Sequence, residues 1–268
     1  MIDYPKAVRE ALSLIGKSDM PVLYVDRPQL PVKFEDNEFD YETERKKAKP
    51  QGCVEVESSH PLYILYTSGS TGQPKGVQRD TGGTAVAVGF SVDLVFDLQP
   101  GDVFFATSDI GWVVGHTYNT YGPLQRGAAT IIYEGKPNTG NPGVFWDIVQ
   151  QYKVKSFYTS PTAMRFLRKE DPEGKYFKDY DVSCMKHFGI VGERTDVHTY
   201  HWIKGIIPED CTYNDTWWQT ETGHIISSNL TKPERHLCKP GSCTKSLPGF
   251  DVRVFSEEGK EVENGKFL

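Results

Sequence analysis

The sequence has no long hydrophobic run and no excess of basic residues. No stretch approaches the roughly 18 consecutive apolar residues that a helix needs to cross a bilayer, so no membrane span is predicted. The 30 Lys and Arg residues are outnumbered by 36 Asp and Glu residues, which gives a formal net charge of −6. A nucleic-acid-binding surface needs concentrated positive charge, so this balance argues against a nucleic-acid partner.

Cysteine is scarce, with 5 in 268 residues and no CxxC pair. An odd count in a long chain indicates reduced thiols in an intracellular compartment rather than a disulfide framework. His236, Cys238 and Cys243 lie close together in sequence. Their spacing matches no zinc-binding pattern, so a structural metal is not expected there.

The composition is that of a globular protein, with 38% hydrophobic and 25% charged residues. From Leu62 onward, strand-like segments alternate with amphipathic helical segments. The expected strands are residues 62–67, 103–107, 129–133, 155–159 and 187–191, and the expected helices are 84–95, 144–152, 161–169 and 196–204. This alternation predicts an α/β fold with a doubly wound, mainly parallel sheet and flanking helices. Ligands of such sheets bind beyond the carboxyl ends of the strands.

The flanking parts of the chain give separate expectations. Asp3 and Pro5 mark the start of a helix with one apolar face. The remaining expectations are a buried strand at residues 20–25, a solvated excursion at 35–50, a short strand at 211–213 and a half-exposed strand at 250–255.

A loop rich in glycine and hydroxyl groups follows the strand expected at residues 62–67. Its glycines let several backbone N–H groups face one point, and Lys75 adds a positive charge. Such a loop suits a polyphosphate, although a flexible Gly/Ser turn is the simpler alternative. The residues expected to hold the phosphates are Thr67, Ser68, Gly69, Ser70, Thr71, Gly72 and Lys75.

Two common motifs are absent, one of nucleotide-binding proteins and one of hydrolases. Lys75 is followed by Gly76 instead of Ser or Thr, so the loop is not the P-loop of kinases and GTPases. The sequence also contains no G-x-S-x-G motif, which excludes the nucleophile elbow of α/β-hydrolases.

Residues 67–77 (TSGSTGQPKGV) resemble, without a gap, the phosphate-binding signature of the AMP-forming adenylate superfamily. That superfamily contains acyl-CoA synthetases, luciferases and the adenylation domains of peptide synthetases. Residues 215–223 (DTWWQTETG) resemble its second signature in the form used by acetyl- and propionyl-CoA synthetases. Residues 192–194 (GER), 109–116 (DIGWVVGH) and the SLPGFDV stretch after Cys243 fit the same subgroup.

The resemblance implies roles for individual residues. Gly192 would lie where the adenine stacks, and Asp215 would contact the adenine amino group. Thr220 would face the α-phosphate, and Glu221 would hold Mg²⁺ as a hard oxygen ligand. With Lys75, these two residues form the expected catalytic set. The implied nucleotide-binding residues beyond the phosphate loop are Gly192, Glu193, Arg194, Asp215, Thr216, Trp217, Gln219 and Thr220.

The resemblance also implies a small acyl pocket with Trp218 as its floor. Its expected residues are Trp112, Val113, Val114, Val191 and Trp218. Large aromatic side chains at the base leave room only for a short acyl chain. Acetate enzymes tend to carry Thr where Val114 stands, so the more apolar wall favours propionate over acetate. His116 is expected to be a hydrogen-bonded structural residue.

The implied activity is that of a short-chain acyl-CoA synthetase using ATP, Mg²⁺ and coenzyme A. A carboxylate, propionate or acetate, and ATP give an acyl-adenylate and pyrophosphate, and coenzyme A then displaces AMP. By the resemblance, residues 1–268 are part of the large N-terminal domain of the adenylate-forming fold, without its first subdomain and its mobile C-terminal domain. The chain alone is therefore expected to be incomplete for catalysis.

Two further expectations follow. An uncovered sheet edge would need the remaining segments or a protein partner. Reduced thiols and the family favour the cytosol or the mitochondrial matrix. The competing hypothesis is a truncated, non-catalytic relative that acts as a structural or adenylate-binding subunit of a larger assembly.

Overall fold

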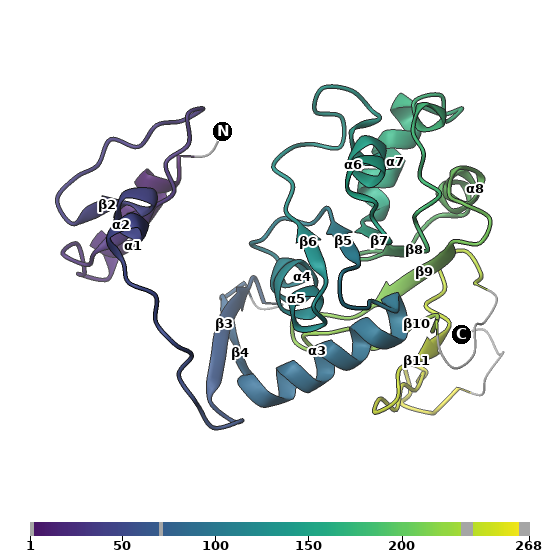
Figure 1. Ribbon diagram of the computed structural model, residues 1–268. Helices are drawn as coiled ribbons and strands as arrows, with labels where there is room; N and C mark the ends of the chain where they lie inside the picture. The colour runs from purple at the N-terminus through teal and green to yellow at the C-terminus, as the bar shows by residue number, and fades with distance from the viewer. Residues whose placement is uncertain (1–2, 70–71, 232–237, 263–268) are drawn as a thin grey trace. The chain divides into compact units, whose positions relative to one another are not determined.

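The structure is a computed structural model that describes residues 3–69, 72–231 and 238–262. The chain divides into two compact units, residues 1–55 and residues 56–268 (Figure 1). Among the described residues, no helix combines the length and the apolar character that a membrane crossing requires.

The first unit contains two helices and a two-stranded parallel sheet. Its elements are α1 (Tyr4–Leu14), β1 (Val22–Tyr24), β2 (Glu38–Asp40) and α2 (Tyr41–Lys47). The expected helix start is confirmed, because the Asp3 carboxylate accepts a hydrogen bond of 3.1 Å from the Lys6 amide. The residues of the expected solvated excursion are mostly exposed, but they form β2 and α2.

The prediction of a buried strand at residues 20–25 is only partly correct. A strand forms there, but Leu23 is 56% exposed and Val25 is 52% exposed, whereas Tyr24 is buried. Alternate residues of a strand face opposite sides of the sheet, and this small sheet buries only one of its sides. The apolar run at residues 20–25 therefore does not mean that both faces of this strand are buried.

The second unit is built around a seven-stranded sheet in the order β11-β10-β9-β8-β7-β5-β6. Five strands are parallel, and two short strands add an antiparallel edge. The parallel strands are β5 (Val103–Ala106), β6 (Ala129–Ile131), β7 (Ser156–Thr159), β8 (His187–Ile190) and β9 (Thr212–Trp217), and the edge strands are β10 (Ser227–Ser228) and β11 (Lys245–Ser246). The doubly wound, mainly parallel α/β fold is confirmed.

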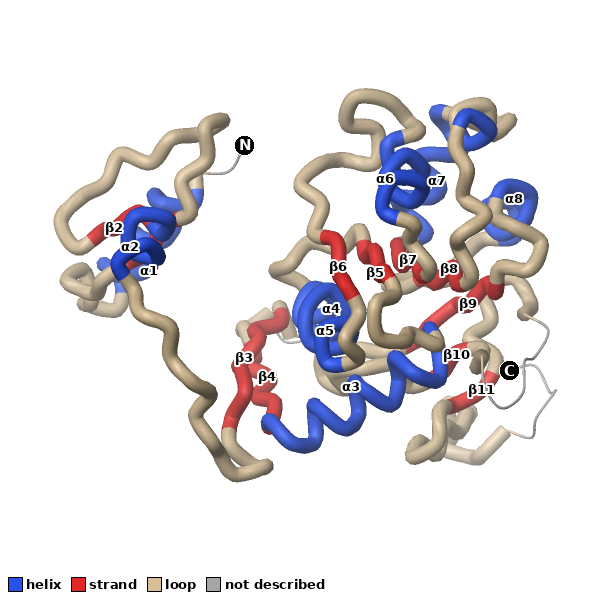
Figure 2. Tube along the Cα trace, in the orientation of Figure 1, coloured by secondary structure: helices blue, strands red, loops and turns tan. Residues whose placement is uncertain are grey.

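Helices cover both faces of this sheet (Figures 1 and 2). One face carries α3 (Thr81–Phe96), α4 (Val113–His116), the π-helical turn η1 (Thr117–Tyr121) and α5 (Gly122–Gln125). The other carries α6 (Val144–Tyr152), α7 (Pro161–Glu170), the 3₁₀ turn η2 (Phe177–Asp179) and α8 (Val197–Ile206). The helices expected at 84–95, 144–152, 161–169 and 196–204 are therefore all present.

Polar side chains define where several of these helices begin. Asp80 accepts a hydrogen bond from the Gly83 amide, Ser160 from the Ala163 amide and Asp196 from the Thr199 amide. Each bond satisfies an amide that has no partner within the first turn of the helix. The cap at Ser160 fixes the turn between β7 and α7, directly beside the cavity described below.

The core has two layers, one on each face of the sheet. Phe104 packs with α3 and η1, and its neighbour Phe105 packs with α6 and α7. On β8, a Cβ atom at Gly189 would lie 2.6 Å from the Tyr158 ring and 2.9 Å from the Phe96 ring. Glycine at this position lets two large aromatic rings pack directly on the sheet.

The phosphate-loop sequence lies in a separate antiparallel hairpin, and not between a strand of the main sheet and its helix. β3 (Pro61–Thr67) pairs with β4 (Lys75–Asp80), and the loop joins them. The sequence analysis interpreted residues 62–67 as the first strand of the parallel sheet, and it did not predict β4. In KGVQRD only Val77 is apolar, so hydrophobic patterning gives little signal.

The strand expected at residues 250–255 does not form. Its alternation is real, and Val252 and Val254 are 44% and 55% exposed. However, residues 251–254 have no regular secondary structure, and Phe255 makes a single isolated bridge to Glu261. A strand needs a neighbour for its backbone groups, and among the described residues this segment has only that bridge. In contrast, β9 is longer than expected and includes Asp215–Trp217 of the second signature.

Candidate functional site

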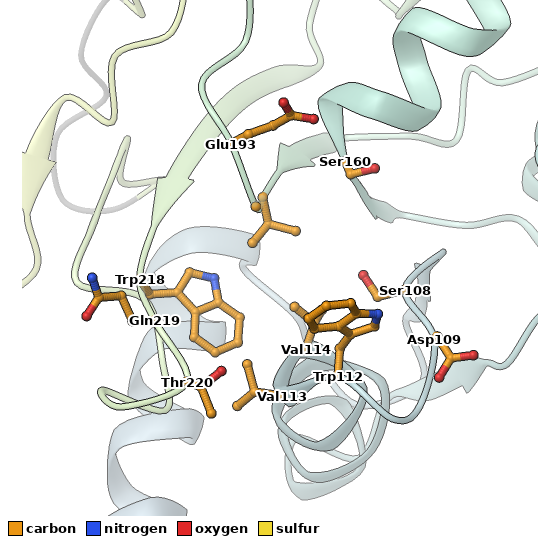
Figure 3. Close-up of a pocket in the computed structure, with 12 residues that line it drawn as sticks. Ser108, Asp109, Trp112, Val113, Val114, Ser160, Glu193, Trp218, Gln219 and Thr220 are labelled. Carbon is orange, nitrogen blue, oxygen red and sulfur yellow. The ribbon is translucent and has the colours of Figure 1, made fainter. Parts of the chain in front are cut away.

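A cavity of about 500 Å³ lies at the carboxyl ends of four parallel strands (Figure 3). Its lining comes from residues 108–109 and 112–114 after β5, Ser160 after β7, residues 191–193 after β8, and residues 218–220 after β9. The chain passes from β5 to β6 on one side and returns to β7 on the other. Ligands of open α/β sheets bind at such a switch point, and the volume is typical of a small-molecule site.

Apolar side chains form most of the cavity wall. The lining includes all five residues assigned to the acyl pocket from sequence, namely Trp112, Val113, Val114, Val191 and Trp218. Val113 and Val114 are buried, whereas Trp112 is 69% exposed. In Figure 3 the Trp112 and Trp218 rings lie on opposite sides of the cavity. Trp112 is therefore a wall at the opening, and not the base that the sequence analysis expected.

The Trp218 indole is held in place by hydrogen bonds and ring packing. Its Nε1 donates to the Tyr158 hydroxyl at 3.1 Å. The Thr216 hydroxyl donates to the Ile190 carbonyl, so Tyr158 is the donor in its 2.7 Å bond to Thr216. The Tyr118 ring meets the indole edge to face, with 5.1 Å between the ring centroids. Burial raises the pKa of Tyr158 well above its ordinary value, so the hydroxyl remains a neutral donor.

The turn that follows Trp218 is fixed from two directions. Within the turn, the Gly223 amide donates to the Gln219 carbonyl at 3.0 Å. From η1, the Thr117 hydroxyl donates to the Gly223 carbonyl at 2.8 Å. From β4, the Arg79 guanidinium donates to the carbonyl oxygens of Thr220, at 2.7 Å, and of Glu221. The Thr220 side of this turn lines the cavity.

Glu221 offers an exposed carboxylate directly after Thr220, which lines the cavity. The residue is exposed, and its carboxylate forms no hydrogen bond or ion pair within the described part of the chain. Mg²⁺ is commonly bound by one or two carboxylates together with substrate phosphates and water. Among the described residues, no group of three or more His, Cys, Asp or Glu side chains is placed to hold a metal alone. His236 lies outside the described residues.

The segment after β8 presents backbone to the cavity and turns its charged side chain away. Gly192 has a φ of 103°, which favours glycine, and the space beside its Cα is open. The Glu193 carboxylate accepts from the Thr162 hydroxyl and pairs with Arg165 at 2.6 Å, which lowers its pKa. Arg194 packs against Gly241, where a Cβ would lie 2.7 Å from its side chain. Glu193 thus anchors the segment to α7 (Figure 3).

Asp215 is a buried carboxylate with one unpartnered oxygen. The residue is 3% exposed, and its Oδ1 accepts a hydrogen bond of 2.7 Å from Thr195. Its Oδ2 has no hydrogen-bond partner among the described residues. Burial is the main cause that raises the pKa of Asp215 to about 6. The Tyr213 hydroxyl and the Gly241 backbone also favour the charged form of this carboxylate, and Asp215 does not itself line the cavity.

The phosphate loop is the turn of the β3–β4 hairpin, and Thr67 pairs with Lys75 at its base. Gly69 has a φ of 63°, and a Cβ there would lie 2.6 Å from the Gln73 carbonyl and 3.3 Å from the Lys75 side chain. Ser70 and Thr71 lie outside the described residues. None of the described loop residues Thr67, Ser68, Gly69, Gly72 and Lys75 lines the cavity, and neither does Trp217, which is 43% exposed on β9.

Sequence reasoning missed several residues at the site. Ser108 and Ser160 line the cavity just after β5 and β7. The rule that ligands bind beyond the carboxyl ends of parallel strands would therefore have found them. Tyr158 and Arg79 act through Trp218 and the turn after it. Their partners are 60 and 141 residues away in sequence, and no local pattern signals such contacts. His116 is bonded to the Trp112 carbonyl and packs on Tyr63, consistent with a structural role.

The comparison with known families now bears on this site. A model of the AMP-binding enzyme family matches residues 6–266. The chain belongs to this family. The resemblance indicated by residues 67–77 is therefore confirmed.

Individual relatives agree with this membership. The chain is 39% identical over 264 residues to an uncharacterized protein of Pseudomonas aeruginosa, covering 98% of this chain and 42% of the relative. It is 39% identical over 266 residues to human acyl-CoA synthetase short-chain family member 3, mitochondrial, covering 98% and 38%. It is 48% identical over 213 residues to an acetyl-coenzyme A synthetase of Cupriavidus metallidurans, covering 78% and 32%. The chain thus spans about two fifths or less of the length of these curated relatives.

Proposed function

We propose that this chain forms the ATP- and carboxylate-binding part of a short-chain acyl-CoA synthetase. The main supporting observation is that the residues assigned to an acyl pocket, from three separate segments, line one cavity together with Thr220. Relatives named as short-chain acyl-CoA and acetyl-CoA synthetases support the same class of reaction. The substrates would be a short carboxylic acid, ATP and coenzyme A.

The reaction places a modest covalent demand on the protein. A carboxylate oxygen attacks the α-phosphorus of ATP, the bond to pyrophosphate breaks, and an acyl-adenylate forms. The thiol of coenzyme A then attacks the acyl carbon, and AMP leaves. The protein must align the attacking oxygen with the departing pyrophosphate and stabilise the charge that develops on the phosphate oxygens.

Residues of this chain perform those tasks. The wall around Trp218 holds the acyl tail, and the Thr220 hydroxyl donates to the α-phosphate. The phosphate loop and Lys75 hold the β- and γ-phosphates. Glu221 would hold Mg²⁺, which would neutralise charge on the phosphate oxygens. Gly192 gives the adenine ring a flat surface, and Asp215 accepts from its amino group.

The acyl wall favours propionate over acetate. Val114 is buried and apolar, so an additional methyl group of the substrate gains contact with hydrocarbon. One methylene is worth about 1–3 kcal/mol of discrimination in such a pocket. The expected preference is therefore modest.

The compartment proposed for the protein is the mitochondrial matrix, with the cytosol as the alternative. Supporting the matrix, relatives that match 98% of this chain carry the word mitochondrial in their names.

The competing hypothesis is a non-catalytic adenylate-binding or structural subunit. On their own, residues 1–268 are proposed to bind ATP without completing adenylation, because the relatives are more than twice as long. The remaining segments of a longer polypeptide, or a protein partner, would then complete the enzyme.

The test is propionate-dependent ATP–pyrophosphate exchange and ATP binding by the 268-residue chain, with acetate as the comparison substrate and Lys75→Ala as the variant. ATP binding that Lys75→Ala weakens, without exchange, is the expected result. Exchange that disappears in Lys75→Ala would show that the chain completes the first half-reaction alone. Absence of both binding and exchange would favour the structural subunit.

A further inference from the structure

We infer that Arg79 is a positioning residue that fixes the Thr220–Glu221 turn relative to the phosphate loop. This inference rests on the proposed function, because it concerns how the two phosphate-binding parts of that site are held together. Arg79 lies outside both signatures and does not line the cavity. Its contacts, however, go to the backbone of the two residues proposed to act on the α-phosphate and Mg²⁺.

The first observation is the double contact of the guanidinium. It donates to the carbonyl oxygens of Thr220 and Glu221, which are consecutive in the chain. The two carbonyl groups belong to the peptide planes on either side of the Glu221 Cα, so these bonds fix the direction in which the Glu221 side chain leaves the backbone. They also fix one of the two planes that flank Thr220, whose other plane is held by the bond from the Gly223 amide to the Gln219 carbonyl. Hydrogen bonds from a charged donor are stronger than those between neutral groups.

The second observation is how closely the guanidinium approaches the turn. A Cβ atom at Gly223 would lie 2.7 Å from Nε and 2.9 Å from Cζ of Arg79, so the group lies directly on the glycine backbone. Its Nε is buried without a hydrogen-bond partner among the described residues. Gly223 has a φ of 79° and receives the Thr117 bond on its carbonyl. Arg79 therefore packs on the turn as well as bonding to it.

The third observation is that one strand carries both Lys75 and Arg79. β4 begins at Lys75, at the end of the phosphate loop, and is paired with β3 through to Asp80. Residues 75, 77 and 79 share one side of the strand, and four residues of strand span about 13 Å. A paired strand resists extension, so the loop that would hold the β- and γ-phosphates stays at a set distance from the turn that would hold the α-phosphate.

A structural role alone would lower stability without changing one ligand more than another. A positioning role predicts a selective effect on the polyphosphate. Arg79→Met should weaken ATP binding in the presence of Mg²⁺ by about tenfold, the expected effect of losing a charged hydrogen bond. Binding of AMP, which keeps the α-phosphate contact with Thr220 but has no β- or γ-phosphate, should weaken less than binding of ATP, because Gly192 and Asp215 are untouched.

The experiment is calorimetric titration of the 268-residue chain with ATP and with AMP, each in Mg²⁺ and in EDTA. Arg79→Met, Arg79→Lys and Arg126→Met are compared with the unsubstituted chain. Arg126 is the matched control, because it is also partly buried, bonds the Leu98 carbonyl and pairs with Asp93, away from the cavity. Arg79→Lys should recover part of the loss, since an ammonium can donate to one carbonyl.

Two binding results would overturn the inference. One is an equal loss of ATP and AMP affinity in Arg79→Met, and the other is the same ATP affinity in Arg79→Met as in Arg126→Met. Hydrogen exchange of the ligand-free chain tests the Arg79 contact without requiring ATP to bind. It therefore distinguishes a failure of this inference from a failure of the proposed function. Arg79→Met, and not Arg126→Met, should speed exchange of the amides of residues 219–223. An unsubstituted chain that binds no ATP would overturn the proposed function, and unchanged exchange would overturn the positioning contact itself.

Discussion

The Trp218 indole and the buried Tyr158 hydroxyl are joined by a hydrogen bond of 3.1 Å. Tyr158 belongs to β7 in the centre of the sheet, and Trp218 follows β9 at the cavity. The bond connects the cavity wall at Trp218 directly to the core. Because the Tyr158 ring also packs on Gly189 and Phe96, the position of the wall depends on how the sheet is packed beneath it.

Tyr158→Phe tests this connection. Loss of the hydroxyl leaves the Trp218 Nε1 without its acceptor, so we expect the free energy of unfolding to fall by about 1–2 kcal/mol. The indole would also move more freely, and the affinity for a propyl ester of AMP should fall relative to that for AMP. Urea unfolding and calorimetric titration measure the two effects. Tyr133→Phe is the control, since its hydroxyl bonds an exposed loop carbonyl; equal effects of the two variants would contradict the prediction.

Trp218→Ala tests the size of the acyl pocket. Removing the indole enlarges the cavity, so hexyl and butyl esters of AMP should bind more tightly relative to the propyl ester. We expect the order of preference to shift by about tenfold, corresponding to one or two buried methylene groups. The matched control is Trp217→Ala, because Trp217 is the next residue along the chain and does not line the cavity. A chain-length order that stays the same in Trp218→Ala would rule out its role as the floor.

Asp215→Asn tests the cost of a buried carboxylate. The pKa of Asp215 in the folded chain is about 6, above the ordinary value of 3.8. Below pH 4 both folded and unfolded chains bind the proton. Between pH 4 and 6 the unfolded chain releases it first, so this group lowers stability as the pH rises, by up to about 3 kcal/mol.

Asp215→Asn should therefore be more stable than the unsubstituted chain at pH 8, by about 2 kcal/mol, and about equal at pH 4. The same variant should bind ATP more weakly at pH 8, since it loses the charged acceptor for the adenine amino group. Urea unfolding at the two pH values gives the stability difference. Asp147→Asn, at an exposed position of α6, provides the control. A stability difference that does not change with pH would refute the assignment.

Gly189→Ala tests the packing beneath the cavity. The added Cβ would lie 2.6 Å from the Tyr158 ring, so the rings must move and we expect a loss of about 2–3 kcal/mol. Gly205→Ala is the comparison, because Gly205 lies in α8 with open space around its Cα. Alanine there should stabilise the helix by about 0.5–1 kcal/mol. Opposite signs in thermal unfolding are expected, and two losses of equal size would contradict this account.

Much of the fold was accessible from sequence because the central parallel strands β7 and β8 are buried along their whole length. β7 and β8 carry mainly aromatic, aliphatic or small side chains and stand between helices with clear starting signals, such as Ser160 before Pro161. The resemblance to the adenylate-forming family then assigned Trp112, Val191 and Trp218 to one pocket, in agreement with the rule that ligands bind beyond the carboxyl ends of parallel strands. Buried parallel strands are the elements for which local patterning and tertiary structure agree.

The features that sequence reasoning missed depend on partners far along the chain. β4 exists because β3 pairs with it, although its own composition is polar. Residues 250–255 have the alternation of a strand but only a single bridge in the described structure. The exposure of Leu23 depends on which side of a small sheet is covered. In each case the deciding interaction is tertiary, and no window of the sequence contains it.

The hydrogen bond from Trp218 to Tyr158 also affects the orientation in which a carboxylic acid would bind in the cavity. The only N–H group of the indole is already used, and Val114 and Val191 have no polar side-chain atom. These three side chains can therefore contact a hydrocarbon tail but provide no hydrogen-bond donor for a negatively charged group. Hydroxyl groups line other parts of the cavity, at Ser108, Ser160 and Thr220. Under the proposed function, the hydrocarbon tail of a carboxylic acid would therefore lie against Trp218, Val114 and Val191, and its polar end would lie towards these hydroxyl groups.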